Sequence, residues 1–174
     1  GHLPPRFLEH DRTKNCWKRL DDVGIPRALQ YEFKGDTDRD GVAVALQKLN
    51  ADQVGIAISF TAQIMESELP KSLAGKTAAI RLDGSTAYDA LPCESVQEEV
   101  TKEIAHFINA VAKNTSEVHL FVCTQASFVL RLGALYQDGM TGPVVIHNYD
   151  ATQKSYPWGI RFDGKVAQTY GVEK

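Results

Sequence analysis

Two stretches of the sequence, SEVHLFVCTQASFVLRLGALY (residues 116–136) and GPVVIHNYD (residues 142–150), decide the fold. Residues 118–123 and 144–146 are short apolar runs, which is the pattern of parallel strands covered on both faces. An apolar helical segment lies between them, so the pattern predicts a strand, a helix and a second, parallel strand. At the crossing from strand to helix, residues 123–127, unpaired backbone N–H groups meet the positive end of the helix dipole. We therefore expect an anion or a polar ligand to bind there.

The remaining apolar patterns predict the other elements of an α/β fold. Strands are expected at residues 28–33, 54–59 and 77–82. Helices are expected at residues 14–22, 42–49, 62–69 and 95–113, with Asp38 close to the start of the second and Ser95 and Glu98 forming a capping box at the start of the last. Residues 158–162 and 166–170 flank an Asp-Gly-Lys turn, which predicts a C-terminal hairpin.

Length and composition are those of an ordinary globular domain. The chain has 174 residues, 43% of them hydrophobic and 24% charged, and a net charge of −3. This charge does not favour binding to long duplex nucleic acid, which needs clustered Lys and Arg. No apolar run reaches the ~18 residues of a transmembrane helix. Three widely spaced cysteines indicate a reduced, intracellular protein. The start at Gly1-His2 leads us to expect a tag remnant or linker at residues 1–13, followed by one domain at residues 14–174.

A family resemblance rests on the two opening stretches. His119-Leu120-Phe121 in a strand, a small-residue crossing, a helix with Leu-x-Leu-Gly and a strand ending in Tyr149-Asp150 resemble the C-terminal half of a SAVED domain. Tyr156-Pro157 follows, and the resemblance covers residues 42–162. It implies a Rossmann-like (CARF-like) α/β fold with a mostly parallel sheet flanked by helices and a C-terminal hairpin.

The resemblance also implies a function. SAVED domains are sensors of bacterial CBASS anti-phage effectors, so this one is expected to be cytoplasmic and to bind a cyclic oligonucleotide of the di- or trinucleotide class. It would activate an attached effector, absent from this chain, through ligand-driven self-association. The sensor itself is expected to be non-catalytic, with no metal and no other cofactor.

Candidate ligand-binding residues follow from the strand ends. A parallel sheet binds ligands at the carboxyl ends of its strands, near the point where the strand order reverses. Hydroxyl groups would bind phosphate or ribose, aromatic rings would stack on bases, and amides or cations would serve either purpose. The residues assigned are Thr61, Thr124 and Ser127 (hydroxyls), Phe60 and Tyr149 (rings), Gln63 and Gln125 (amides), Asp150 at the same rim, and Arg12, Lys14, Arg131 and Trp17 nearby.

Each assignment has a structural alternative. The hydroxyl residues could be helix caps, and Phe60, Tyr149 and Trp17 could pack in the core. His119, inside an apolar strand, is expected to be a hydrogen-bonded core histidine. The alternative function is a cysteine-dependent hydrolase with Cys123 as nucleophile, His147 as base and Asp150 orienting it. No Gly-x-Gly-x-x-Gly phrase follows a strand, which disfavours a nicotinamide-dependent enzyme.

Overall fold

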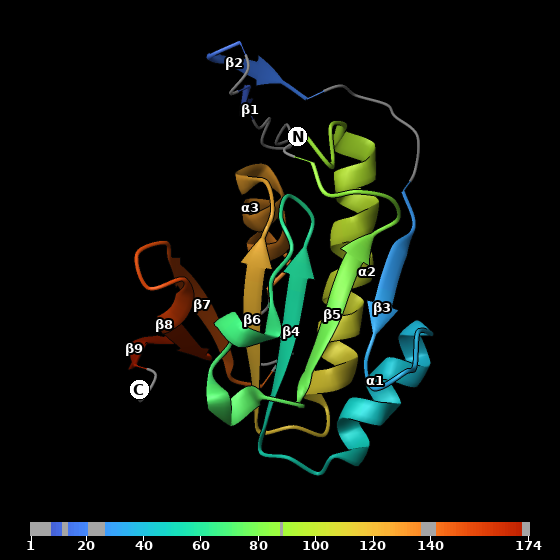
Figure 1. Cartoon of the computed structure of the whole chain (residues 1–174), viewed down its shortest axis with the longest axis vertical. Coiled ribbons are helices and arrows are strands. Elements are labelled where there is room, and N and C mark those ends of the chain that lie inside the picture. The colour runs from blue at the N-terminus through green and yellow to red at the C-terminus, as the bar shows by residue number, and fades with distance from the viewer. Residues whose placement is uncertain (1–7, 12–13, 21–26, 88, 137–141, 172–174) are drawn as a thin grey trace.

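A seven-stranded sheet forms the centre of the molecule. The computed structural model describes residues 8–11, 14–20, 27–87, 89–136 and 142–171. The strand order is β3-β5-β4-β6-β7-β8-β9. The strands are β3 (Leu29–Glu32), β4 (Gln53–Ser59), β5 (Thr77–Leu82), β6 (Glu117–Cys123), β7 (Val144–Asp150), β8 (Ser155–Asp163) and β9 (Val166–Gly171). The central strands β5, β4, β6 and β7 are parallel, and β3, β8 and β9 are antiparallel to their neighbours (Figure 1).

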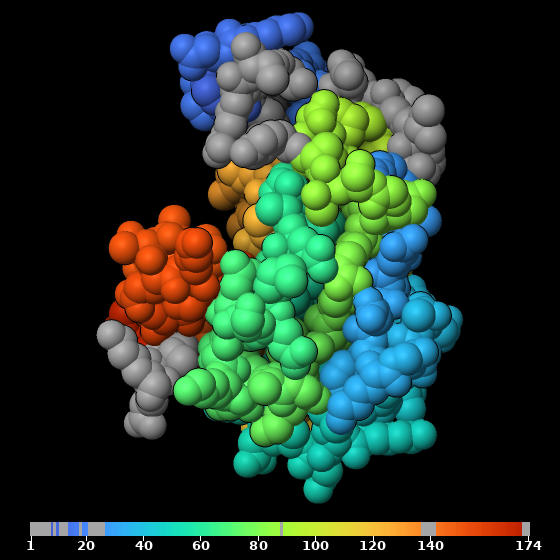
Figure 2. Space-filling model, in the orientation of Figure 1, coloured from blue at the N-terminus to red at the C-terminus, as the bar shows by residue number. Residues whose placement is uncertain are grey.

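Helices cover one face of the sheet, and a non-helical segment covers part of the other. The helices are α1 (Arg39–Lys48), α2 (Glu94–Ala112) and α3 (Ala126–Ala134). In Figure 1, α2 and α3 lie behind the sheet, while the short turns η1 (Glu66–Glu68) and η2 (Lys71–Leu73) lie in front of it. Figure 2 shows this front segment between the C-terminal strands and β3.

Two apolar clusters correspond to the two faces. The larger joins the helices to the sheet and includes Ile104, Phe107 and Phe128. The smaller lies under the η1–η2 segment and contains Ala57, Ile64, Leu73, Phe121 and Tyr156. Strands covered on both faces are apolar on both, which is why β4 is buried from Val54 to Ser59.

The predicted fold class is confirmed. The strand predicted at residues 77–82 has those bounds, and the predicted strand–helix–strand unit forms from β6, α3 and β7. Asp38 is the N-cap of α1, because its carboxylate accepts a hydrogen bond from Gly41 N at 2.9 Å. The C-terminal hairpin forms around Gly164, whose φ of 57° lies in the left-handed region that glycine tolerates.

The helix predicted at residues 14–22 is wrong over the part that the structure describes. Strand β2 (Cys16–Arg19) pairs there with β1 (Leu8–Asp11), while residues 21–22 lie outside the described part. A partner strand satisfies the backbone groups of this short segment, so its local helical pattern does not decide the outcome. Trp17 is 68% exposed and is therefore no core anchor. Strand β1 also shows that residues 8–11 of the expected linker are paired.

Two other helix predictions are corrected. Within the helix expected at residues 62–69, only the 3₁₀ turn η1 forms; η2 follows after Pro70. Helix α2 begins at Glu94, and its N-cap is Cys93, two residues before the expected cap Ser95, with no side-chain cap bond.

Candidate functional site

The strand order reverses between β4 and β6, and the predicted rim lies there. The chain runs from β4 to β5 on one side, then crosses through α2 to β6 on the other side. Phe60 N and Thr61 N both donate to Cys123 O, at 2.9 and 3.1 Å, which ties the two strand ends together. Reversal points of this kind are where open α/β sheets bind their ligands.

A cluster of polar and aromatic side chains gathers on the front of this rim. Thr61 Oγ1 lies 3.5 Å from Cys123 Sγ. The Tyr149 hydroxyl donates to Glu68 Oε1 at 3.1 Å, and the Tyr149 ring lies 5.1 Å from the Tyr156 ring. We call these five residues (Thr61, Glu68, Cys123, Tyr149 and Tyr156) the rim cluster.

The two tyrosines of the rim cluster differ in exposure. Tyr149 is 43% exposed, whereas Tyr156 is 4% exposed and packs edge-on against Phe121. Burial raises the pKa of Tyr156, and partial burial together with the bond to Glu68 raises the pKa of Tyr149. Both phenols are therefore neutral and can donate hydrogen bonds. Tyr149 offers an accessible ring to a planar ligand, backed by the buried ring of Tyr156.

Other predicted residues turn inward. Phe60 is 1% exposed and packs against Phe128, with ring centroids 5.3 Å apart, which matches the core-packing alternative. Gln125 Oε1 accepts from Leu91 N at 2.7 Å, and Ser127 Oγ accepts from Gln97 Nε2 at 2.9 Å. In this structure these side chains hold residues 91–97 against α3, so neither an aromatic platform at Phe60 nor a free amide at Gln125 is presented to a ligand.

The remaining predicted residues are spread around the rim. Gln63 is exposed, and Asp150 accepts from Thr152 N and Gln153 N, which lowers the pKa of its carboxyl and closes the turn after β7. Lys14 and Trp17 lie on the β1–β2 hairpin, which Figure 1 places beyond the carboxyl ends of β4 and β6, where β1 contacts α3. Arg131 pairs with Glu94 at 3.1 Å. Arg12 lies outside the described residues.

Thr124 Oγ1 is a buried hydroxyl that finds no hydrogen-bond partner within the described parts of the chain. A buried hydroxyl without a partner costs free energy. Among the residues predicted to bind phosphate or ribose, Thr124 is the one whose buried hydroxyl has no hydrogen-bond partner in the described structure. Gln125 is the N-cap of α3 without a side-chain cap bond, so neither Thr124 nor Ser127 caps that helix.

We expect the neighbouring residues Thr124 and Gln125 to respond differently to mutation. Thr124→Val keeps the shape and removes only the unpaired buried hydroxyl, so the free energy of unfolding should stay the same or rise, by up to about 1 kcal/mol. Gln125→Ala leaves buried Leu91 N without its acceptor and should cost about 1–3 kcal/mol. Urea unfolding of both variants checks this. Equal losses of unfolding free energy in the two variants would contradict the distinction between the unpaired Thr124 hydroxyl and the hydrogen-bonded Gln125 amide.

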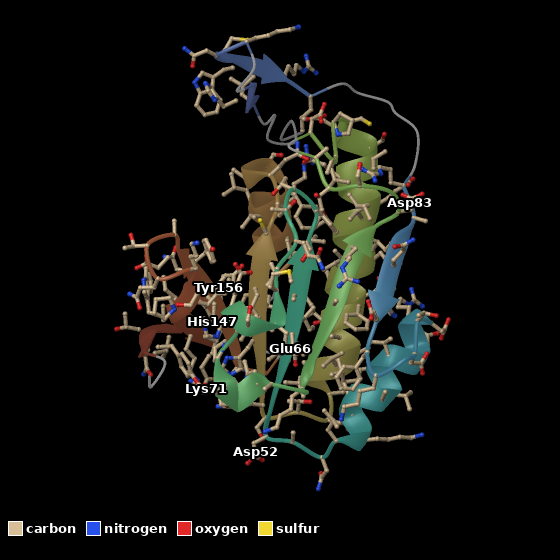
Figure 3. All side chains as sticks on the ribbon, viewed as in Figure 1. Asp52, Glu66, Lys71, Asp83, His147 and Tyr156 are labelled. Carbon is tan, nitrogen blue, oxygen red and sulfur yellow. The ribbon has the colours of Figure 1, made fainter. Side chains whose placement is uncertain are left out.

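A buried histidine pair lies below the rim cluster. His119 Nε2 lies 2.9 Å from Glu117 Oε1, and His119 Nδ1 lies 2.8 Å from His147 Nε2. Glu117 also accepts from Gln53 and from Arg161, the latter at 2.5 Å. His119 is 1% exposed, which confirms the prediction of a hydrogen-bonded core histidine. Figure 3 shows His147 next to Tyr156 on the front of the sheet.

The protonation of this pair follows from its partners. Burial lowers the pKa of His119 despite the nearby Glu117 charge, and it lowers the pKa of His147 to about 3. Both rings are therefore neutral at pH 7. The Glu117 carboxylate only accepts, so His119 donates from Nε2 and accepts at Nδ1 from His147. His147 Nδ1 is left as a buried acceptor with no partner among the described residues.

The sequence analysis assigned no role to Glu68, Glu117 or Arg161. The alternation of Glu117 and His119 on one face of β6 was a usable signal for a buried pair, since residues two apart on a strand share a face. Glu68 gave no such signal, because its contact with Tyr149 joins segments 81 residues apart.

The geometry does not assemble the hydrolase alternative. Cys123 Sγ is beside Thr61, whereas His147 Nε2 is bound to His119 and Asp150 holds the turn that follows it. A nucleophile and its base must lie within hydrogen-bond reach. Within the described residues no group of three His, Cys, Asp or Glu side chains is arranged to hold a metal ion.

One family matches most of the chain. The model of the SAVED family, the "SMODS-associated and fused to various effectors sensor domain", matches residues 4–162. The chain belongs to the SAVED family. This confirms the resemblance drawn from the two opening stretches. No curated protein matches this SAVED chain in sequence.

Two solved structures of the SAVED/CARF-domain containing receptor Cap4 from Acinetobacter baumannii are similar to this SAVED chain. The structure with the cyclic trinucleotide 3'3'3'-cAAA has a TM-score of 0.52 and 14% identity, over 86% of this chain and 31% of that one. The structure with 2'3'3'-cAAA has a TM-score of 0.49 and 15% identity, over the same shares. At this identity the likeness to the first shows the fold alone, and this SAVED chain spans about a third of the receptor. Within its described residues, no helix has the length and hydrophobicity needed to cross a membrane.

Proposed function

We propose that this SAVED domain binds a cyclic oligonucleotide of the di- or trinucleotide class at the carboxyl ends of β4, β6 and β7. Membership of a family of sensor domains carries the proposal. The rim cluster supports the position, because it combines an accessible ring at Tyr149 with the hydroxyl groups of Thr61 and Tyr149. Stacking rings and hydrogen-bond donors are what nucleotide recognition requires.

The proposed response to ligand binding is self-association. The domain acts without catalysis of its own, in the bacterial cytoplasm, and ligand binding drives self-association that activates an attached effector in anti-phage defence. A ligand drives association only if it binds the associated state more tightly than the free one. Exposed turns near the rim, at residues 83–85 and 151–155, are the segments a ligand could order. Residues 137–142, a further candidate segment in the sequence, lie outside the described part except for Gly142.

A melting-temperature screen tests the proposed ligand class. Cyclic trinucleotides of adenosine are the first probes, because the similar Cap4 structures contain them, and cyclic dinucleotides and linear triadenylate are the comparison ligands. A ligand at about one hundred times its dissociation constant adds roughly 2.7 kcal/mol to stability. No stabilisation by any cyclic di- or trinucleotide would overturn the proposal. Sedimentation velocity with the bound ligand then tests association, and a monomer at saturation would place assembly outside this domain.

Tyr149→Leu tests the binding position. We expect the affinity for the active cyclic nucleotide to fall by about 1–3 kcal/mol, because a base loses its aromatic platform. The melting temperature of the free domain should hardly change, since the ring is half-exposed. Isothermal calorimetry measures the affinity. Trp158→Leu is the matched control, because Trp158 is also 43% exposed. Its cross-strand partner is Asn148, so its side chain lies on the face of the sheet opposite to that of Tyr149. If Tyr149→Leu binds the cyclic nucleotide as tightly as Trp158→Leu does, the ligand binds elsewhere.

A further inference from the structure

The two edges of the sheet differ in how they are protected. Strand β3 is a four-residue edge strand that contacts α1 and carries Glu32, paired with Arg81 at 2.6 Å. Strand β9 ends the sheet on the other side, and within the described residues no strand pairs with its outer edge. Short length, charge and cover are the devices that keep an edge strand from pairing with another chain. Among the described residues, nothing charged and no covering segment protects the outer side of β9, and the strand is two residues longer than β3.

Strand β9 is regular, uncharged and held in place. Its sequence Val-Ala-Gln-Thr-Tyr-Gly contains no proline and no charged residue, and it pairs with β8 over six consecutive positions without a bulge. The Tyr170 ring contacts His119 and His147, with centroids 5.2 and 5.6 Å away, and this anchors the strand to the core. The remaining five residues are exposed. A regular, anchored edge strand of this kind is a preformed template for a further strand.

The sequence of β9 is compatible with pairing to itself. We propose that β9 is a dimerisation edge, on which the β9 strand of a second copy of this chain pairs in antiparallel orientation around a two-fold axis at Thr169. In this register Thr169 faces the partner's Thr169, and Gln168 faces the partner's Tyr170. Cross-strand Thr pairs are favourable, and an uncharged strand opposes no like charges. The two-fold axis pairs the outer backbone groups of both β9 strands with each other, as in an isologous interface.

A half-exposed apolar row runs toward the same edge. Ile146, Ile160 and Thr169 are register partners across β7, β8 and β9 and therefore lie on one face, and both isoleucines are 39% exposed. The proposed axis continues this row into the same three residues of the second copy. The favoured occupant is consequently a copy of this chain and not an unrelated strand. The area buried by a six-residue strand pair is smaller than the about 1,600 Å² of a standard interface. The dimer is therefore expected to be weak and reversible.

Sedimentation velocity without any nucleotide tests the proposal. The wild-type domain should pass from monomer to dimer as its concentration rises through the micromolar range, because an interface below the standard size binds weakly. Thr169→Lys places two ammonium groups across the axis and should raise the dimer dissociation constant by up to about fivefold, since like charges directly opposite are destabilising. Thr169→Val should leave it unchanged or lower it. Thr152→Lys, an exposed threonine in the turn before β8, is the matched control and should not affect it.

Hydrogen exchange separates this edge from other contacts. Amides of residues 166–171 should exchange more slowly at high than at low protein concentration in the wild type, and this difference should be smaller in Thr169→Lys. A monomer throughout the concentration range overturns the proposal, as does a dimer that Thr169→Lys leaves as tight as in the wild type. The melting temperature of Thr169→Lys confirms that the variant is folded. Because no nucleotide is present, failure here does not bear on the proposed ligand.

Discussion

Replacing Glu117 with alanine is expected to lower the free energy of unfolding by about 3 kcal/mol, because a buried network loses its acceptor. Glu117 is 8% exposed and accepts hydrogen bonds from His119, Gln53 and Arg161. The alanine variant leaves the donor of a buried histidine without an acceptor and weakens the attachment of β8, because Arg161 keeps only its bond to Asp163.

Urea unfolding measures this loss, and two further variants interpret it. Glu117→Gln keeps an oxygen acceptor for His119 and should lose less, about 1–2 kcal/mol. Glu98→Ala is the matched control: its ion pair with Lys102 is solvent-exposed, so a change within about 0.5 kcal/mol is expected. A Glu117→Ala loss no larger than that of Glu98→Ala would show that the buried network contributes little to stability.

Acidification from pH 7 to pH 5 is expected to destabilise the domain by about 2 kcal/mol through His147 alone. The pKa of His147 is about 3 in the folded state, against 6.5 for an ordinary histidine, because burial opposes the charged form. Below pH 6.5 the unfolded chain therefore binds a proton that the folded domain does not. The stabilisation is complete above pH 6.5 and is lost progressively as the pH falls toward 3. His119, whose pKa is also lowered, acts in the same direction.

Urea unfolding at pH 7, 6 and 5 checks this dependence. His147→Gln should reduce the difference between pH 7 and pH 5 by about half or more, since one buried neutral imidazole is removed. His106→Gln, a substitution of an exposed histidine on α2, controls for the loss of a histidine as such. Wild-type stability that is constant to within about 0.5 kcal/mol across this range would contradict a buried neutral pair.

The position of the rim was predictable, but the bonding of its residues was not. A polar segment that follows a buried parallel strand lies at the carboxyl edge of the sheet whatever its neighbours are, so residues 59–61 and 123–125 could be assigned to one edge. What each side chain does there depends on segments remote in the sequence. Gln125 meets Leu91, Ser127 meets Gln97, and Tyr149 meets Glu68.

The sequence by itself determined the elements whose signals are local and strong. The strand patterns at 77–82 and 118–123, the long amphipathic helix before β6, the Asp38 cap and the Asp-Gly hairpin turn each depend on residues within a few positions. Only the tertiary structure decided the weaker segments. Residues 16–19 became a strand because β1 pairs with them, and residues 66–73 became 3₁₀ turns that cover the front of the sheet. It likewise decided the His119–His147 pair, since two rings 28 residues apart meet only after β6 and β7 have aligned, and burial then holds both neutral.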